Sequence, residues 1–265
     1  MKTSATVVAD TLSYQGARIT TMRLVYPRCI HAQMLRHTAL RRNVMSSRAV
    51  PTERLLEIVR TDPYVPNDWR RNRPGMRSDT RLSGEALLNA VDEWLAARDE
   101  ALRSAIKLAD IGAHKQHVNR LLEPFLCVVE IVTATQDAWD NMLFWRFDQE
   151  ADPEAYILAI AVKDALLGSR PITNDIHSPM AYSEDPYTCA GRIARVSYDR
   201  DTEKEPVEKT VERAKRMLAA GHIGPFEHYA WGCGATERHG AYVGWESYRH
   251  RMRLDEVAKT RRQRD

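Results

Sequence analysis

The sequence predicts a helix-rich domain of the α/β or α+β class, and three segments indicate this class. Residues 17–26 are rich in β-branched and apolar side chains, which is typical of a strand. Residues 85–111 carry apolar side chains near helical spacing and are followed by a glycine, as expected of a long amphipathic helix with a C-terminal stop. An Asp-Pro-Glu triplet at residues 152–154 combines a capping acid with a first-turn proline, so a further helix should begin there.

The rest of the chain is expected to alternate between helices and loops. The remaining predicted elements are a helix over residues 28–42, an irregular loop over 61–84, a helix over 117–146 that breaks at Pro124, a loop from 168 to about 190 and a helix over 206–220. We find no internal repeat and no clear domain boundary. The sequence therefore predicts one domain over residues 1–250, followed by an Arg-rich tail over 251–265.

The composition of the 265 residues fits a globular protein that binds small anions. Apolar residues make up 43% of the chain and charged residues 28%, so a sizeable core is possible. The net charge is only +3, and much of the positive charge is arginine, which presents a rigid fork to phosphate and carboxylate. Such a chain favours a small anionic ligand over duplex DNA, because a duplex binder concentrates basic charge on one face.

The four cysteines are too far apart for a metal or redox site formed by neighbours in the sequence. Cys29, Cys127, Cys189 and Cys233 include no CxxC pair, so we expect no metal ion and four reduced thiols. The N-terminal residues lack the long apolar stretch of a signal peptide, and no run of about 18 apolar residues predicts a membrane span. We therefore expect a cytoplasmic protein with no membrane partner.

Polar side chains gather between Gln33 and Arg48, where they are suited to bind a nucleotide. On a helix, positions 33, 36, 37 and 40 share one face, and Ser46 and Ser47 follow shortly after it. Amide, guanidinium, imidazole and hydroxyl groups on one surface can hold phosphates and read the edge of a base. A solvated, Arg-rich helix face explains the same pattern, and the segment alone does not decide between these interpretations.

The spacing of this segment resembles the Arg-His-Arg motif of flavin-dependent thymidylate synthases. In that family a glutamine precedes the motif, and asparagine, serine and arginine follow it at fixed offsets. The matching positions are Gln33, Arg36, His37, Asn43, Ser46 and Arg48. Thr38 stands in place of the motif's second arginine, and Arg41 stands where a serine is usual.

Further segments are similar to the same family. Residues 221–228 resemble its Gly-His-x-x-Pro-Phe-Glu-His turn, and residues 194–198 resemble the segment that precedes this turn. Residues 141–146 resemble its Asn-to-Leu-Arg segment, with Trp145 in place of the leucine, and residues 119–124 resemble its Arg-x-x-Leu-Pro segment with one residue inserted. Without the resemblance, residues 221–228 are as readily a Gly-Pro turn with a packed phenylalanine, and Arg120 and Arg146 would be ordinary surface or ion-pair arginines.

The order of these segments is unusual for the family. In most members the histidine-containing turn comes shortly before the Arg-His-Arg helix, whereas here it lies near the C-terminus. Chain termini lie at the surface and are often close together, so a permuted chain is physically tolerable. The resemblance, which covers residues 18–250 in patches, therefore implies a divergent, circularly permuted member of a phage type.

The resemblance implies a helix-rich catalytic domain with a small antiparallel sheet. The implied reaction transfers a one-carbon unit from methylenetetrahydrofolate to C5 of a pyrimidine deoxynucleotide, dUMP to dTMP, with FAD as cofactor and NADPH as reductant. The implied catalytic residues are Ser46, Arg48 and His222. The implied nucleotide ligands are Gln33, Arg36, Ser46, Ser47, Arg48, Arg120 and Arg146. The implied flavin and folate contacts are Arg36, His37, Thr38, Asn43, Asn141, His222, Gly224 and Glu227. A homotetramer without a stable nucleic-acid partner is implied as well.

Signatures of other nucleotide enzymes are missing from the sequence. Cys29 lacks the Pro-Cys-His context of ordinary thymidylate synthases, so we expect no protein nucleophile. The paired motifs of zinc deaminases, a complete dinucleotide fingerprint and a Walker loop do not occur.

Three alternatives stay open from the sequence. Thr38 and Arg41 alter the motif in the part of the site that a change of substrate would affect. The substrate could therefore be dCMP instead of dUMP, and the product could carry a hydroxymethyl instead of a methyl group. The same departures allow a family member that has lost activity. The third alternative is of another class, a non-enzymatic protein that binds nucleic acid through the Arg-rich helix and tail.

Overall fold

A five-stranded sheet organises the structure, a computed structural model that describes residues 2–75, 78–180, 185–197 and 205–252. The strands are β1 (Ser4–Leu12), β2 (Arg18–Pro27), β3 (Arg41–Val44), β4 (Cys127–Thr135) and β5 (Ile172–Thr173). They lie in the order β3-β4-β2-β1-β5, and every neighbouring pair is antiparallel except β1 and β5. The helix-rich fold with a small, largely antiparallel sheet is confirmed, and the strand predicted at residues 17–26 is β2. Residues 253–265 of the expected tail lie outside the described part of the chain.

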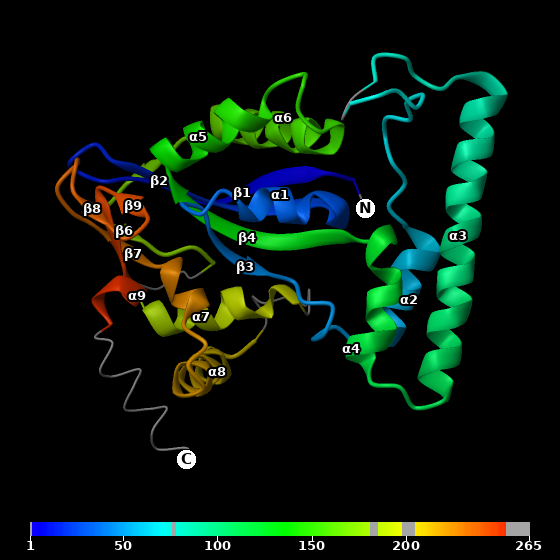
Figure 1. The fold of residues 1–265 in the computed structure, drawn as a ribbon. Coiled ribbons are helices and arrows are strands. Elements are labelled where there is room, and N and C mark those ends of the chain that lie inside the picture. Colours follow the sequence, from blue (N-terminus) through cyan, green and yellow to red (C-terminus); the bar gives the residue numbers. More distant parts are fainter. Residues whose placement is uncertain (1, 76–77, 181–184, 198–204, 253–265) are drawn as a thin grey trace.

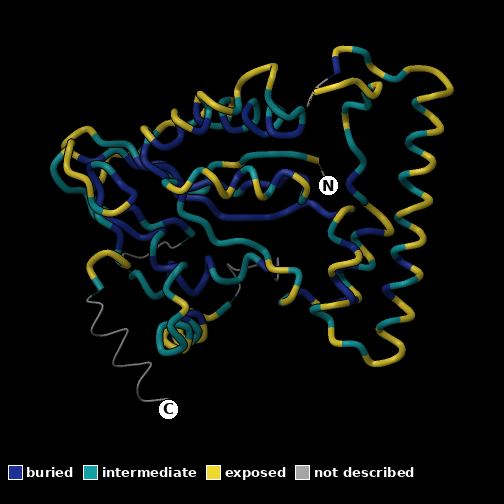
Figure 2. The backbone as a smooth tube through the Cα atoms, viewed as in Figure 1, coloured by how far each residue is buried: buried dark blue, intermediate teal, exposed yellow. Residues whose placement is uncertain are grey.

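Helices cover both faces of this sheet (Figure 1). Those on one face are α1 (His31–Leu35), α5 (Gln136–Arg146) and α6 (Pro153–Gly168), and those on the other are α7 (Pro186–Ile193) and α8 (Val207–Ala219). All nine residues of β4 are buried between these layers, as Figure 2 shows for the central strands. Successive side chains of β4 point to opposite faces, so Val132 packs with α5 and α6 while Ile131 packs with α7.

Strand β4 corrects the helix predicted over residues 117–146. Only α4 (Lys115–Val118) and α5 are α-helical there, with a 3₁₀ helix over Asn119–Phe125 and then the strand. Most residues of β4 are β-branched, which favours a strand packed on both faces over a helix. That enrichment was the signal in the sequence that favoured a strand here.

The helix predicted over residues 28–42 is wrong beyond Leu35. A 3₁₀ turn over Arg28–Ile30 leads into the short α1, and the chain then turns and forms β3. Strand β3 pairs with β4, with Asn43 opposite Ile131. The ladder to β4 satisfies backbone groups that a continued helix would have satisfied locally, so tertiary pairing overrides the local preference.

Other sequence predictions are confirmed. Helix α3 (Gly84–Asp110) ends just before Gly112, whose φ of +81° suits a residue without a side chain. The Asp152 carboxylate accepts hydrogen bonds from the backbone N–H groups of Glu154 and Ala155, so it caps α6 as expected. The described residues between 62 and 83 form the predicted irregular loop. The loop after α6 is shorter than expected, because α7 begins at Pro186.

Two smaller units flank the sheet. At one end, α2 (Thr52–Thr61), α3, α4 and the 3₁₀ helix enclose a separate apolar cluster that includes Leu55, Val59 and Leu102 (Figure 1). At the other end lie β6 (Ile176–His177), β7 (Ala230–Gly232), β8 (Arg238–His239), β9 (Tyr242–Val243), β10 (Trp245–Ser247) and α9 (Tyr248–Arg251).

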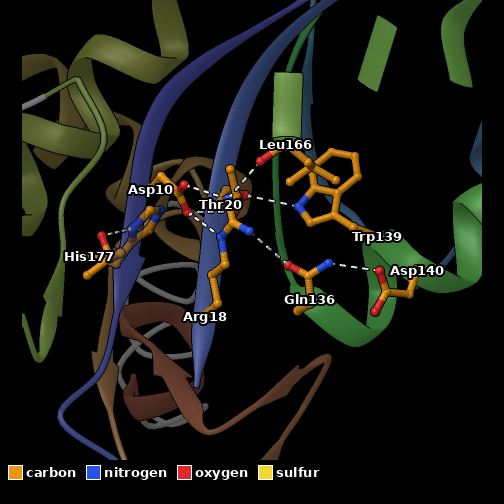
Figure 3. Close-up of polar contacts among 9 residues, drawn as sticks. Asp10, Arg18, Thr20, Gln136, Trp139, Asp140, Leu166 and His177 are labelled. Atoms are coloured by element: carbon orange, nitrogen blue, oxygen red, sulfur yellow. Dashed lines mark hydrogen bonds and ion pairs between the residues drawn. The ribbon is translucent and has the colours of Figure 1, made fainter. Parts of the chain in front are cut away.

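A bidentate ion pair between β1 and β2 connects the sheet to α5, through Gln136, and to α6 (Figure 3). The Arg18 guanidinium donates to both carboxylate oxygens of Asp10 at 2.9 and 2.7 Å, and also to the carbonyl of Leu166 at 3.2 Å. The Thr20 hydroxyl donates to the same carboxylate at 3.0 Å. Because one carboxylate collects donors from two positions of β2, it fixes the β1–β2 register against the helical layer.

Two fully buried histidines form a continuous hydrogen-bonded row with three threonines. The His177 ring contacts the hydroxyls of Thr11 and Thr21, each at 2.8 Å. Thr21 contacts Thr133 at 2.5 Å, and Thr133 contacts Nδ1 of His228 at 2.8 Å. Burial lowers the pKa of both histidines to about 3, so both rings are neutral at physiological pH.

We expect the two rings to make folding sensitive to acid. The unfolded chain binds their protons below about pH 6.5, while the folded chain does so only near pH 3. Their stabilising contribution is therefore complete above pH 6.5 and is lost as the pH falls, by about 2 kcal/mol for each ring between pH 7 and pH 5. Between pH 7 and pH 5, the His228→Gln variant should lose about 2 kcal/mol less unfolding free energy than the native protein loses. Urea unfolding at both pH values measures this difference.

The control for this experiment is His222→Gln, because His222 is exposed to solvent. This variant should keep the native dependence of unfolding free energy on pH. An unchanged dependence in His228→Gln would contradict the neutral, buried state of its ring.

Candidate functional site

An open cavity of about 480 Å³ lies between the chain that follows β3 and the 3₁₀ helix ahead of β4. It is lined by Arg28, Val44, Met45, Ser46, Ser47, Arg48, Arg120 and Glu123. Four of these, Ser46, Ser47, Arg48 and Arg120, are nucleotide ligands predicted from the sequence. The structure therefore brings together two predicted segments that are more than 70 residues apart in the chain.

A buried asparagine holds the two walls of this cavity together. The Asn119 side chain is fully buried and donates to the backbone carbonyls of Ser47 at 2.7 Å and Val50 at 3.1 Å. Its own carbonyl accepts from the Thr52 hydroxyl at 2.8 Å. Because Arg120 is the next residue, this contact fixes the start of its side chain relative to Ser47.

Two charged residues of the cavity were not predicted from the sequence. The Glu123 carboxylate accepts from the Ser47 hydroxyl at 2.6 Å and lies 3.6 Å from the Arg28 guanidinium. Glu123 precedes Pro124 in the segment that resembles the family's Arg-x-x-Leu-Pro stretch with one residue inserted, and the sequence analysis gave Glu123 no role. Arg28 carried no signal in the sequence either, since it reaches the cavity only because its backbone N–H donates to Leu126 as β2 ends beside β4.

A second group of predicted ligands forms a separate cluster between α1 and α5. The Arg146 guanidinium donates to His37 Nε2 at 3.0 Å, to the Gln33 side-chain carbonyl at 3.1 Å and to the Gln33 backbone carbonyl at 3.3 Å. The Gln33 amide donates in turn to Asp152 at 3.0 Å. Burial, with the positive charge of Arg146, lowers the pKa of His37 to about 4, so its neutral ring accepts the bond. These three side chains contact one another and lie outside the cavity.

The two motif segments at opposite ends of the chain meet at β3. Asn43 donates to the Ile193 carbonyl at 2.7 Å, and the Arg41 guanidinium lies 3.7 Å from the Glu227 carboxylate. Glu227 also pairs with Arg249 at 2.7 Å. Arg41 and Asn43, which lie in β3, are thus the residues of this segment that contact the later segments.

The remaining predicted ligands reach neither the cavity nor the α1–α5 cluster. The side chains of Arg36, Thr38, Asn141 and His222 are exposed to solvent. A Cβ placed on Gly224 would meet open space, so the fold imposes no glycine there. Within one chain, the described residues therefore assemble most of the predicted nucleotide ligands but do not gather the predicted flavin ligands into one site.

Comparison with known proteins relates this architecture to solved structures. No protein-family model and no curated protein sequence matches the chain. The crystal structure of the UMP/dUMP methylase PolB from Streptomyces cacaoi, bound with 5-Br UMP, superposes with a TM-score of 0.52 at 16% sequence identity. The two proteins share a fold. The match covers 62% of this chain and 88% of PolB.

The likeness to PolB concerns the fold and does not test the circular permutation, which stays a prediction. All four cysteines are free, as expected. Among the described residues, no helix is both long and apolar enough to span a membrane.

We expect Arg146→Gln to loosen the α1–α5 cluster. Loss of three charge-assisted hydrogen bonds should lower the free energy of unfolding by about 1–2 kcal/mol. The pKa of His37 should rise from about 4 towards 6.5 without reaching it, because burial, the larger cause of its shift, remains. Denaturant unfolding and NMR titration of the ring measure the two effects. Arg36→Gln is the matched control, since the exposed Arg36 affects His37 less than Arg146 does; equal effects of the two variants would contradict the cluster.

Proposed function

We propose that the chain transfers a one-carbon unit to C5 of a pyrimidine nucleotide bound in the Arg48–Arg120 cavity. One observation carries this proposal: serine and arginine side chains from two distant motif segments converge on a single cavity, in a fold shared with a UMP/dUMP methylase that binds 5-Br UMP. The proposed substrate is dUMP and the proposed product is dTMP.

Charge in the cavity supports binding of a nucleotide monophosphate. Arg48 and Arg120 are exposed, and among the described residues neither forms an ion pair, so both guanidinium groups are available for a phosphate. Arg28 is already neutralised by Glu123. The hydroxyl of Ser46 would add a donor, and a guanidinium near a base carbonyl would stabilise negative charge that develops on the ring.

The cofactors proposed from the family resemblance are FAD, methylenetetrahydrofolate and NADPH. Bound flavin and folate would supply the reducing equivalents and the one-carbon unit. The guanidinium, imidazole and amide groups of Arg146, His37 and Gln33 suit a phosphate-bearing cofactor chemically, although they now bind one another. Because these groups lie apart from Glu227 and His222 within one chain, we propose that a second copy completes the flavin site in a homotetramer.

A second candidate substrate, dCMP, is favoured by Glu123. A carboxylate only accepts hydrogen bonds at neutral pH, and the 4-amino group of cytosine donates them where the 4-carbonyl of uracil accepts. Glu123 lines the cavity and still has lone pairs beyond its contact with Ser47. A methyl or a hydroxymethyl group on C5 of dCMP would fit the same chemistry.

We expect the purified chain to take up FAD and to turn over a pyrimidine nucleotide when folate and NADPH are added. Arg120→Gln should raise KM for the nucleotide roughly 10- to 100-fold, because a charge-assisted phosphate contact contributes about 1.5–3 kcal/mol. Product mass spectrometry with dUMP and dCMP identifies the substrate and distinguishes methyl from hydroxymethyl.

Arg216→Gln provides the matched control, because Arg216 is an exposed arginine on α8, away from the cavity. It should leave KM unchanged. A colourless protein that takes up no FAD, consumes neither nucleotide and binds DNA with a steep dependence on salt would overturn the proposal in favour of nucleic-acid binding.

Glu123→Gln should reveal which base the cavity prefers. Glutamine can still accept from Ser47, but it also presents an amide donor that suits the uracil 4-carbonyl. If Glu123 reads cytosine, the ratio of kcat/KM for dCMP to that for dUMP should fall about tenfold or more. An unchanged ratio would remove Glu123 as a determinant of the base and would leave dUMP as the proposed substrate.

A further inference from the structure

Metal-binding side chains cluster at the end of the molecule formed by β7–β10. Two trios of possible ligands share His239: one adds Cys233 and Glu237, and the other adds Glu246 and His250. In each trio the ligand atoms lie within 4.8 Å of one another. Ligands at roughly 2.0–2.3 Å from one Zn²⁺ ion lie closer together than this, so binding would draw the side chains inward. The spacing of cysteines in the sequence gave no sign of this cluster, because only one of these ligands is a cysteine.

The backbone holds the first trio in a compact turn. The N–H of Glu237 donates to the Gly234 carbonyl at 2.9 Å, and the N–H of Cys233 donates to the Gly244 carbonyl at 3.0 Å. Gly244 donates back to the Glu237 carbonyl at 2.7 Å. Gly244 has a φ of +75°, and a Cβ there would lie 2.3 Å from the Cβ of Ala17, so this close approach requires glycine.

Two buried aromatic residues anchor the turn to the rest of the protein. Trp245 is fully buried and donates from its ring to the Ala17 carbonyl at 3.2 Å. The hydroxyl of the buried Tyr242 donates to the Glu227 carbonyl at 2.8 Å. Strands β7, β8, β9 and β10 have two or three residues each, and the apolar core that they share is small. A metal ion that joins Cys233 to His239 would therefore stabilise a segment with little apolar packing of its own.

Existing contacts distinguish the two trios. Glu246 already forms an ion pair with Arg251, so a metal ion in the second trio would have to compete with a guanidinium. In the first trio, the Glu237 carboxylate lies 3.3 Å from the His239 ring and, among the described residues, forms no ion pair with a lysine or arginine. The thiol of Cys233 is partly accessible. Thiolate and imidazole ligands favour Zn²⁺ over calcium or magnesium.

We infer that Cys233, Glu237 and His239 bind one Zn²⁺ ion, with water in the fourth tetrahedral position. Binding displaces the thiol proton of Cys233 to solvent, and no electron transfer is involved. The site rests on these ligands alone and is independent of the proposed nucleotide chemistry.

The test uses the full chain after treatment with a chelator. Zn²⁺ is titrated against a chromophoric chelator, and Co²⁺ is added separately as a spectroscopic probe. We expect one equivalent of Zn²⁺, a thiolate-to-cobalt charge-transfer band and a higher Tm with the metal. Cys233→Ser should remove the band and weaken Zn²⁺ binding by more than the roughly 10- to 100-fold that loss of a supporting contact costs at metal sites.

Two further variants complete the experiment. Glu237→Gln changes a side chain that is 63% exposed, so it should fold normally and still weaken Zn²⁺ binding. Cys29→Ser removes the exposed cysteine elsewhere in the chain and should change nothing. The proposal is overturned if the protein binds no Zn²⁺, or if Cys233→Ser binds as tightly as the native protein. Tight binding that is lost only in Glu246→Gln or His250→Gln would assign the ion to the second trio and would also overturn it.

Discussion

The pairing of β2 with β4 is the constraint on which the rest of the structure depends. Nine consecutive residue pairs join these strands, from Ile19 opposite Thr135 to Pro27 opposite Cys127. In this register β2 ends beside the start of β4, which directly follows the 3₁₀ helix, so Arg28 and Glu123 meet at this end of the sheet. Ser46, Ser47 and Arg48, which follow β3, lie beside this end, and the candidate nucleotide cavity forms there. A slip of one residue would exchange the two faces of β4 and would dismantle both the core and the cavity.

Several polar groups inside the sheet link separate layers, whereas among the described residues both carboxylate oxygens of Glu130 and Nε2 of His228 have no hydrogen-bond partner. Asp10 with Arg18 connects the sheet to α6, and the row from His177 to His228 connects it to the C-terminal turn. Burial raises the pKa of Glu130 to about 7, although Arg42 lies 3.7 Å away and opposes the shift. The groups that are hydrogen-bonded contribute little net stability, but they disfavour any alternative packing that would leave them without a partner.

The sequence motifs indicated several residues of the candidate site, but they did not indicate the backbone elements that carry them. Ser46, Ser47, Arg48 and Arg120 do line one cavity, whereas Gln33, His37 and Arg146 bind one another elsewhere. The motif segment was expected to be one helical face, yet it consists of a short helix, a turn and a strand. The spacing of a motif shows which residues belong together, but it does not show the backbone that joins them, and it gave no role to Glu123.

The sequence by itself determined the elements that local chemistry specifies. Strand β2, the Asp152 cap and the glycine stop after α3 follow from side-chain volume, capping groups and φ preferences that neighbours in the chain decide. Only the tertiary structure decided that residues 127–135 form the central strand, that β3 replaces a helix, and that Cys233 meets His239. The physical reason is that these outcomes depend on hydrogen bonds and burial supplied by distant segments, whose free energy exceeds the small local preferences a sequence pattern can display.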